Sequence, residues 1–208
     1  MKTIDLGTWP RRAHYEHFRR FDCPRWDLCT ELDVTAFRES VRRAGSSFHY
    51  AFVHAVTKSV QETEAFRYRI RGEDVVLHER VHPRFTDMDK GSELFKLVTA
   101  RFLDERATFV AEAQARSRAQ IEPFPPESQE ERDDLVYLTC VPWFSFTRIS
   151  HAWNLSKDDC VPRIAWGQFV PKDGRTTIPF AVEANHAFVD GLHMAQLIGA
   201  VQKNLDAG

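Results

Sequence analysis

The sequence contains few cysteines, no long apolar run and almost no excess of charge of either sign. No stretch approaches the roughly 18 uncharged apolar residues that a membrane-spanning helix needs. A formal net charge of -2 argues against a nucleic-acid-binding protein. We therefore expect a cytoplasmic protein that binds neither membrane nor nucleic acid. The four cysteines form no Cys-x-x-Cys pair, and we expect free thiols at Cys23, Cys29, Cys140 and Cys160.

What is present is typical of an ordinary globular chain. Hydrophobic residues make up 43% of its 208 positions, enough for a sizeable core. We find no internal repeat and no low-complexity linker, so we predict a single domain over residues 1–208. The proline-rich stretch 122–128 reads as a surface loop within that domain.

The first half of the chain alternates helical and strand patterns. Residues 33–35 cap a predicted helix that runs to about Arg43, and a second helix begins near Tyr50. The remaining predicted elements of this half are strands over 66–70, 74–78 and 81–86, followed by one long helix over 92–119.

The second half is rich in strand-forming residues. A turn over 172–175 predicts a hairpin, and a helix from about Gly191 to Leu205 closes the chain. Helices and strands are therefore interleaved, which predicts a two-layer α/β (α+β) sandwich with a mixed β-sheet rather than a Rossmann fold. The predicted strands of this half are 135–138, 143–147, 164–170 and 176–184.

The most informative motif is His186-x-x-x-Asp190-Gly191, which lies between the last strand and the last helix. A histidine at such a junction can take a proton from a hydroxyl that attacks a thioester, because its ordinary pKa lies near neutral pH. A purely structural interpretation is also open. Asp190 would then be the N-cap of the last helix, and His186 a strand-end histidine bonded to backbone.

The motif occurs in a chain that resembles the chloramphenicol acetyltransferase family along nearly its whole length. The N-terminal segment 9–15 resembles the family signature Trp-x-Arg-Lys/Arg-x-His-Phe. Further similar segments are 48–52 at the start of a helix, 66–86 over a hairpin, 142–147 with its Pro-Trp pair, and 167–186.

The resemblance implies a function and an assembly. It implies a homotrimer with an active site at each subunit interface, where acetyl-CoA, as acyl donor and co-substrate, meets a small-molecule acceptor such as chloramphenicol. His186 would be the general base that activates the acceptor hydroxyl. Asp190 would support the site by pairing with Arg11, and Phe18 would line the acceptor pocket. The alternative interpretation of Phe18 is an ordinary phenylalanine of the core.

Some positions depart from the family pattern. Where the family has a serine whose hydroxyl stabilises the oxyanion, this sequence has Arg148. A guanidinium can donate to an oxyanion, or it can pair with a carboxylate elsewhere. Thr147 and Ser145 are weaker substitutes. The residue before the base, usually a second histidine, is Asn185.

Three further departures concern the reacting centre and the coenzyme. The resemblance implies a threonine that helps to hold a water near the intermediate, and Ala165 stands at its position. It also implies two lysines that favour the phosphates of CoA, and their positions are Ser47 and Gln168, so we expect weaker or differently arranged coenzyme binding. Two alternatives therefore stay open. One is an acyltransferase for a different alcohol or amine acceptor, and the other is a non-catalytic trimeric relative.

The other reactive side chains carry less information. His14, His17 and His49 lie in segments that can face the acceptor pocket. The remaining histidines show no metal-ligand spacing, so we predict no metal. Cys140 is a poor candidate nucleophile because no obvious base is near it in the sequence.

Overall fold

A seven-stranded mixed sheet forms the centre of the protein. The computed structural model describes residues 1–126, 132–153, 156 and 158–208. Its strands are β2 (Arg25–Asp33), β5 (His82–Met88), β6 (Phe95–Thr99), β7 (Leu135–Cys140), β8 (Arg163–Trp166), β9 (Val170–Lys172) and β10 (Arg175–Asn185). The order is β2-β10-β8-β7-β5-β6, with β9 paired to β10. The pairs β5–β7 and β7–β8 are parallel and the other pairs antiparallel. The predicted mixed sheet is confirmed.

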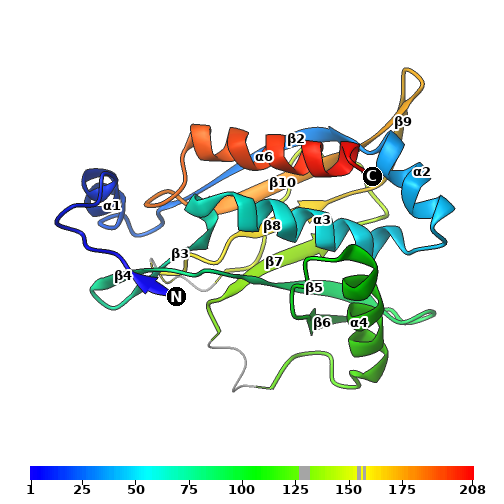
Figure 1. The fold of residues 1–208 in the computed structure, drawn as a ribbon, viewed down its shortest axis with the longest axis horizontal. Coiled ribbons are helices and arrows are strands. Elements are labelled where there is room, and N and C mark those ends of the chain that lie inside the picture. Colours follow the sequence, from blue (N-terminus) through cyan, green and yellow to red (C-terminus); the bar gives the residue numbers. More distant parts are fainter. Residues whose placement is uncertain (127–131, 154–155, 157) are drawn as a thin grey trace.

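Four helices pack against this sheet: α2 (Thr35–Arg43), α3 (Phe48–Glu62), α4 (Arg106–Ala119) and α6 (Gly191–Asp206). The helix α1 (Arg12–Phe18) lies beyond the end of the sheet (Figure 1), and a short 3-10 turn, η1 (Glu64–Arg67), follows α3. α3 and α6 lie side by side across the sheet, and α3 buries residues on every side. A three-stranded sheet of β1 (Lys2–Thr3), β4 (Asp74–Leu77) and β3 (Tyr68–Arg71) adjoins α1.

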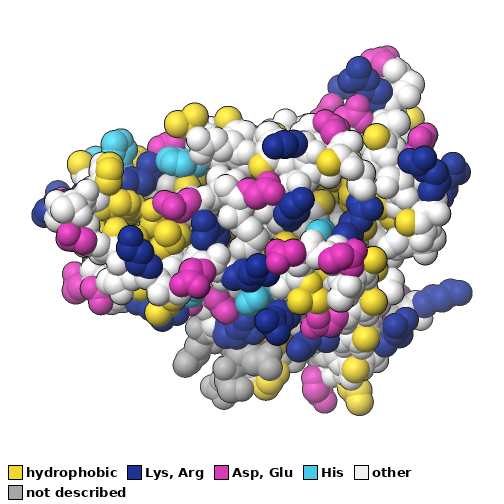
Figure 2. Space-filling model, in the orientation of Figure 1, with side chains coloured by type: hydrophobic (Ala, Val, Ile, Leu, Met, Phe, Trp, Pro, Cys, Tyr) yellow, Lys and Arg dark blue, Asp and Glu magenta, His cyan; other side chains and the backbone are white. Residues whose placement is uncertain are grey.

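The core fills the space between the helices and the main sheet. Alternate residues of β10, such as Phe180, Val182 and Ala184, belong to it, whereas Glu183 points to the other face of the sheet. On the view of Figure 2, charged side chains of both signs are mixed over the surface, in keeping with the small net charge. No helix in the described ranges is long and apolar enough to cross a bilayer.

One predicted helix is wrong. Residues 92–119 form strand β6 and then helix α4 instead of a single helix. Over β6 the period is two: Val98 is buried in the core, while Phe95 and Leu97 line a groove on the other face. The helix begins only after Glu105, whose side chain accepts hydrogen bonds from the backbone N–H groups of Ala107 and Thr108.

The predicted strand over 143–147 is also wrong. This segment is irregular, and the carbonyl of Phe144 accepts a single hydrogen bond from the Gln168 N–H, at 2.7 Å. Trp143 and Phe144 are exposed, at 60% and 62% of their surface, instead of alternating between core and solvent. Phe66, predicted in a strand, belongs to η1.

Candidate active site

His186 lies in a tight loop between β10 and α6. Its backbone N–H donates to the Pro24 carbonyl at 2.6 Å, and the next turn closes when Phe188 and Val189 donate to the Asn185 carbonyl, both at 3.1 Å. The side-chain oxygen of Asn185 accepts from the Ala187 N–H at 3.0 Å. The asparagine that replaces the family's second histidine therefore shapes this loop.

Arg11 holds the loop from outside. Its Nε donates to the Ala187 carbonyl at 2.9 Å, one terminal nitrogen to Asp190 Oδ2 at 2.8 Å, and the other to the His186 carbonyl at 3.2 Å. The ion pair between Arg11 and Asp190 that the resemblance implied is thus present. A planar guanidinium carries its donors on three separate nitrogens and so reaches all three acceptors at once. A lysine carries its donors on a single nitrogen and cannot span them.

Asp190 is also the N-cap of α6, as the structural interpretation proposed. Its Oδ1 accepts from the Leu192 N–H at 3.1 Å, and its own N–H donates to Nδ1 of His193 at 3.2 Å. Burial raises the pKa of Asp190, but the hydrogen bond from Arg11 and the nearby His193 outweigh it and lower the pKa to about 2. The carboxylate is therefore ionised at neutral pH, and it serves the helix and the loop together.

Two aromatic rings enclose the imidazole of His186. Phe18 stacks on it with centroids 3.9 Å apart and planes within 8°, and Trp26 lies 5.2 Å away at 26°. The Trp26 Nε1 donates to the Val189 carbonyl at 2.9 Å, which ties β2 to the histidine loop. Phe18, expected to line a pocket, thus contacts the imidazole itself. Trp26 was not predicted, because its contact depends on the pairing of β2 with β10.

The expected oxyanion donors, Arg148 and Thr147, both have exposed side chains. A terminal nitrogen of Arg148 lies 3.3 Å from Asp27 Oδ1, and 75% of the Arg148 side chain is exposed. Thr147 is exposed as well. Across the described ranges, no hydrogen bond or ion pair joins either residue to His186.

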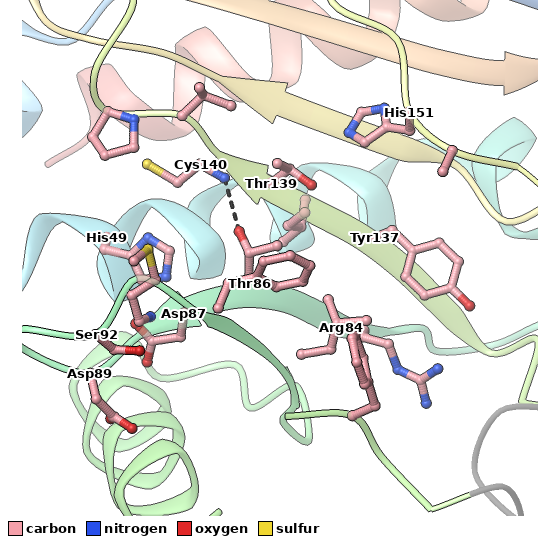
Figure 3. Close-up of a pocket in the computed structure, with 18 of the residues that line it drawn as sticks. His49, Arg84, Thr86, Asp87, Asp89, Ser92, Tyr137, Thr139, Cys140 and His151 are labelled. Atoms are coloured by element: carbon pink, nitrogen blue, oxygen red, sulfur yellow. Dashed lines mark hydrogen bonds between the residues drawn. The ribbon is translucent and has the colours of Figure 1, made fainter. Parts of the chain in front are cut away.

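A groove of about 1410 Å³ opens beside β5, β6 and β7 (Figure 3). Figure 3 shows Arg84, Tyr137 and His151 at one end and His49, Asp87, Asp89 and Ser92 at the other. Its remaining lining includes the apolar side chains of Phe95, Leu97, Phe124 and Trp143. Six separate stretches of the sequence, between His49 and Arg163, line this groove. The sequence alone therefore did not predict it, beyond the expectation for His49.

Cys140 lies in the groove wall, where its N–H donates to the hydroxyl of Thr86 at 3.2 Å (Figure 3). Burial raises the pKa of the Cys140 thiol to about 12. The thiol is therefore protonated at neutral pH, and a protonated thiol is a poor nucleophile. Within the described part of the chain, no cluster of three or more metal-binding side chains occurs.

Comparisons with known proteins agree on one family. The profile of the family described as chloramphenicol acetyltransferase matches residues 1–202. A chloramphenicol acetyltransferase of Streptomyces acrimycini is 30% identical over 202 residues, 96% of this chain and 91% of the relative. The Escherichia coli protein named chloramphenicol acetyltransferase 2 is 26% identical over 206 residues, 98% of this chain and 96% of that protein.

Solved structures extend the comparison to the fold. A structure of a chloramphenicol acetyltransferase superposes with a TM-score of 0.91 at 26% identity, covering 98% of this chain and 99% of that one. A probable dihydrolipoamide acetyltransferase from Listeria monocytogenes 4b F2365 has a TM-score of 0.68 at 15% identity, covering 100% of this chain and 95% of that one. The second likeness is one of fold alone.

Proposed function

Because this chain belongs to the chloramphenicol acetyltransferase family and is an acetyltransferase, we propose that it acetylates a hydroxyl of chloramphenicol or of a related acceptor. The donor in this proposal is acetyl-CoA, and His186 is the general base. The observation that carries the assignment of His186 is its loop, which Arg11 fixes at two carbonyls and at Asp190.

The proposed reaction is a direct transfer within a complex of both substrates. His186 accepts the proton of the acceptor hydroxyl as that oxygen attacks the thioester carbonyl. The carbon–sulfur bond then breaks, and the proton passes to the departing CoA thiolate. The stack on Phe18 and Trp26 restricts rotation of the imidazole, so that the base is positioned before the substrates arrive.

The assembly that we propose is a homotrimer with active sites between subunits. Exposed apolar side chains line the groove at Phe95, Phe124 and Trp143, and Leu94 next to Phe95 is exposed as well. Such a rim favours coverage by another protein surface. In this arrangement His186 of one subunit faces the groove of its neighbour. Arg148, or secondarily Thr147, would then donate to the oxyanion across the interface.

Donor binding depends on residues other than those of the family pattern. Ser47 and Gln168 stand where the family pattern has lysines, and they supply no positive charge for the phosphates of CoA. We propose correspondingly weak binding of acetyl-CoA. We also propose a cytoplasmic location, since CoA thioesters are intracellular metabolites.

The pairing of Arg148 with Asp27 favours a second candidate, a trimeric relative without turnover, if that ion pair persists in the assembled protein.

The test is thiol release from acetyl-CoA by the purified protein with chloramphenicol and with a panel of other alcohols and amines. His186→Ala should lower kcat roughly 100- to 10,000-fold, the usual contribution of a general base. His82→Ala, which removes a histidine that does not line the groove, should keep kcat within about twofold. Equal thiol release by wild type and His186→Ala would show that His186 is not the base.

A further inference from the structure

A small hollow opens where β5 begins and β6 ends, and positive side chains surround it. Its volume is about 250 Å³, and its lining is His82, Thr99, Ala100, Arg101, Arg116 and Arg132. The hollow adjoins the Arg84 end of the groove (Figure 3), because Nε of Arg84 donates to the Thr99 hydroxyl at 2.9 Å. Within the described chain, its lining has three guanidinium groups and no carboxylate, which favours an anion.

The imidazole of His82 has one nitrogen engaged and the other available. Nδ1 accepts the backbone N–H of Phe102 at 3.0 Å, and a backbone amide can only donate. Nδ1 therefore holds the lone pair and Nε2 the hydrogen. Burial lowers the pKa of His82, which agrees with a neutral ring. Oδ2 of Asp134 lies 4.0 Å from Nε2, too far for a hydrogen bond, so His82 offers an N–H donor to a ligand.

The hydroxyl of Thr99 is a second available donor. Its oxygen accepts from Arg84, whose guanidinium has only donors, so that bond does not use the hydroxyl hydrogen. Among the described residues, no acceptor is hydrogen-bonded to this hydrogen. Thr99 is buried, and a buried donor gains free energy when a ligand supplies its acceptor.

The three arginines differ in how far carboxylates already neutralise them. Asp134 holds Arg132 through two hydrogen bonds of 2.8 and 2.9 Å. Glu112 lies 3.8 Å from Nε of Arg116, whose side chain is 56% exposed. Arg101 is exposed and makes no hydrogen bond or ion pair with the described residues. Two carboxylates thus face three guanidinium groups, and an anion would complete the balance.

We infer that this hollow binds a phosphoryl group, either as inorganic phosphate or at the end of a small phosphorylated compound. Each oxygen of a phosphate accepts hydrogen bonds, so one group can take donors from His82, Thr99 and Arg101 together. The planar fork of an arginine also matches phosphate geometry. The hollow is smaller than the roughly 300–1,000 Å³ of pockets for drug-sized ligands, which favours a group of this size.

The hollow is separate from the coenzyme site that the family pattern implies. The positions at which that pattern has lysines for the phosphates of CoA are Ser47 and Gln168, and neither lines the hollow. Ser47 directly precedes α3, whereas Gln61, near the other end of α3, donates to the Val81 carbonyl at 2.6 Å, next to His82 in the chain. A helix rises about 1.5 Å per residue, so roughly 20 Å separate Ser47 from the hollow.

Calorimetry on the intact protein at constant ionic strength tests this inference. The probes are inorganic phosphate and glycerol 3-phosphate, with acetate as a singly charged control. We expect the phosphates to bind about tenfold more tightly than acetate. Arg101→Gln should weaken the binding of both about tenfold, the value of one charge-assisted hydrogen bond. Whichever phosphate binds more tightly shows whether the ligand is free phosphate or a phosphorylated compound.

Arg118 provides a matched control for Arg101→Gln. Like Arg116, it lies in the last turn of α4, and it is exposed but does not line the hollow. Arg118→Gln removes the same charge and should change the affinity for phosphate by less than about twofold, because solvent screens an exposed charge. Equal losses in Arg101→Gln and Arg118→Gln would show a general attraction by net charge and would overturn the site.

Acetyl-CoA distinguishes the hollow from the coenzyme site. Saturating acetyl-CoA should leave the affinity for phosphate unchanged, and Arg101→Gln should bind acetyl-CoA as the wild type does. Displacement of phosphate by acetyl-CoA, or weaker binding of acetyl-CoA by Arg101→Gln, would mean that the hollow is the coenzyme site and that the inference is wrong. If neither phosphate binds, the inference is wrong as well, whether or not the protein transfers acetyl groups.

Discussion

Arg11 shows how much of the site depends on one side chain. It donates to two carbonyls of the loop and to Asp190, and the loop carries the proposed base. Arg11→Lys keeps the charge but replaces a planar fork by a single ammonium group. We expect kcat for acetyl transfer to fall about 10- to 100-fold with little change in KM, because the imidazole is misplaced.

The neighbouring residue provides the control for this prediction. Arg12 pairs with Glu16 on the exposed side of α1, with 2.7 Å between Nε and Oε1. Arg12→Lys should therefore leave the kinetics unchanged. Steady-state rates for both variants decide the question, and equal kcat in Arg11→Lys and wild type would contradict the positioning role.

Asp190 gives a prediction on pH. Its pKa is about 2 in the folded protein against an ordinary value of 3.8, so its ionised form stabilises the fold above about pH 4. That contribution is lost as the pH falls through the folded pKa. The difference in free energy of unfolding between wild type and Asp190→Asn should therefore be larger at pH 7 than at pH 3. Urea unfolding at both values checks this, and an equal difference would contradict it.

The site residues divide by how they were recognised. His186, Asp190 and Arg11 followed from short motifs that match a family, and the structure brings the three together. His49 was expected to face a pocket and does line the groove. His151 also lines the groove and was not predicted to do so, because its contact with Glu183 joins positions that are 32 apart.

At the scale of elements, two glycines make a matched pair. A Cβ on Gly167 would lie 2.5 Å from the Phe144 carbonyl oxygen and 2.6 Å from Pro179 Cγ, whereas one on Gly199 in α6 would meet nothing within 4 Å. Gly167→Ala should lower the free energy of unfolding by about 1–3 kcal/mol. Gly199→Ala should raise it by about 0.5–1 kcal/mol through helix propensity.

Chemical denaturation of both variants measures these changes. Gly167 follows β8 and donates its N–H to the Pro179 carbonyl at 3.1 Å, so its backbone cannot move freely away from the clash. If Gly167→Ala is as stable as the wild type, the prediction is wrong, and the backbone around Phe144 must then move away from the new Cβ without a loss in free energy of unfolding.

The elements also show where sequence patterns fail. Most helices and strands were predicted within a few residues, because amphipathic periods and turn residues mark them locally. The segment 92–119 was misread since the apolar residues of β6 are followed closely by those of α4, and together they imitate one helical period. The aromatic segment 143–147 was misread because strand propensity assumes that aromatic side chains pack on a half-buried sheet, whereas Trp143 and Phe144 are exposed.

At the scale of the whole molecule, the exposed apolar rim predicts association. Leu94 and Trp143 expose 79% and 60% of their surface beside the groove. We expect light scattering to give a mass three times that of the 24.1 kDa chain. Aspartate at both positions should shift the protein toward single chains and abolish acetyl transfer. A wild-type mass equal to one chain would contradict the trimer.

The contact of Arg11 with the Ala187 carbonyl joins residues 176 positions apart in the chain. During synthesis, the chain must therefore emerge from the ribosome as far as Ala187 before this contact can form. Contacts of such long range slow folding, because the entropy of closing the loop is lost before the contact forms. The site is thus completed late in biosynthesis, and a product that terminates before Ala187 lacks it altogether.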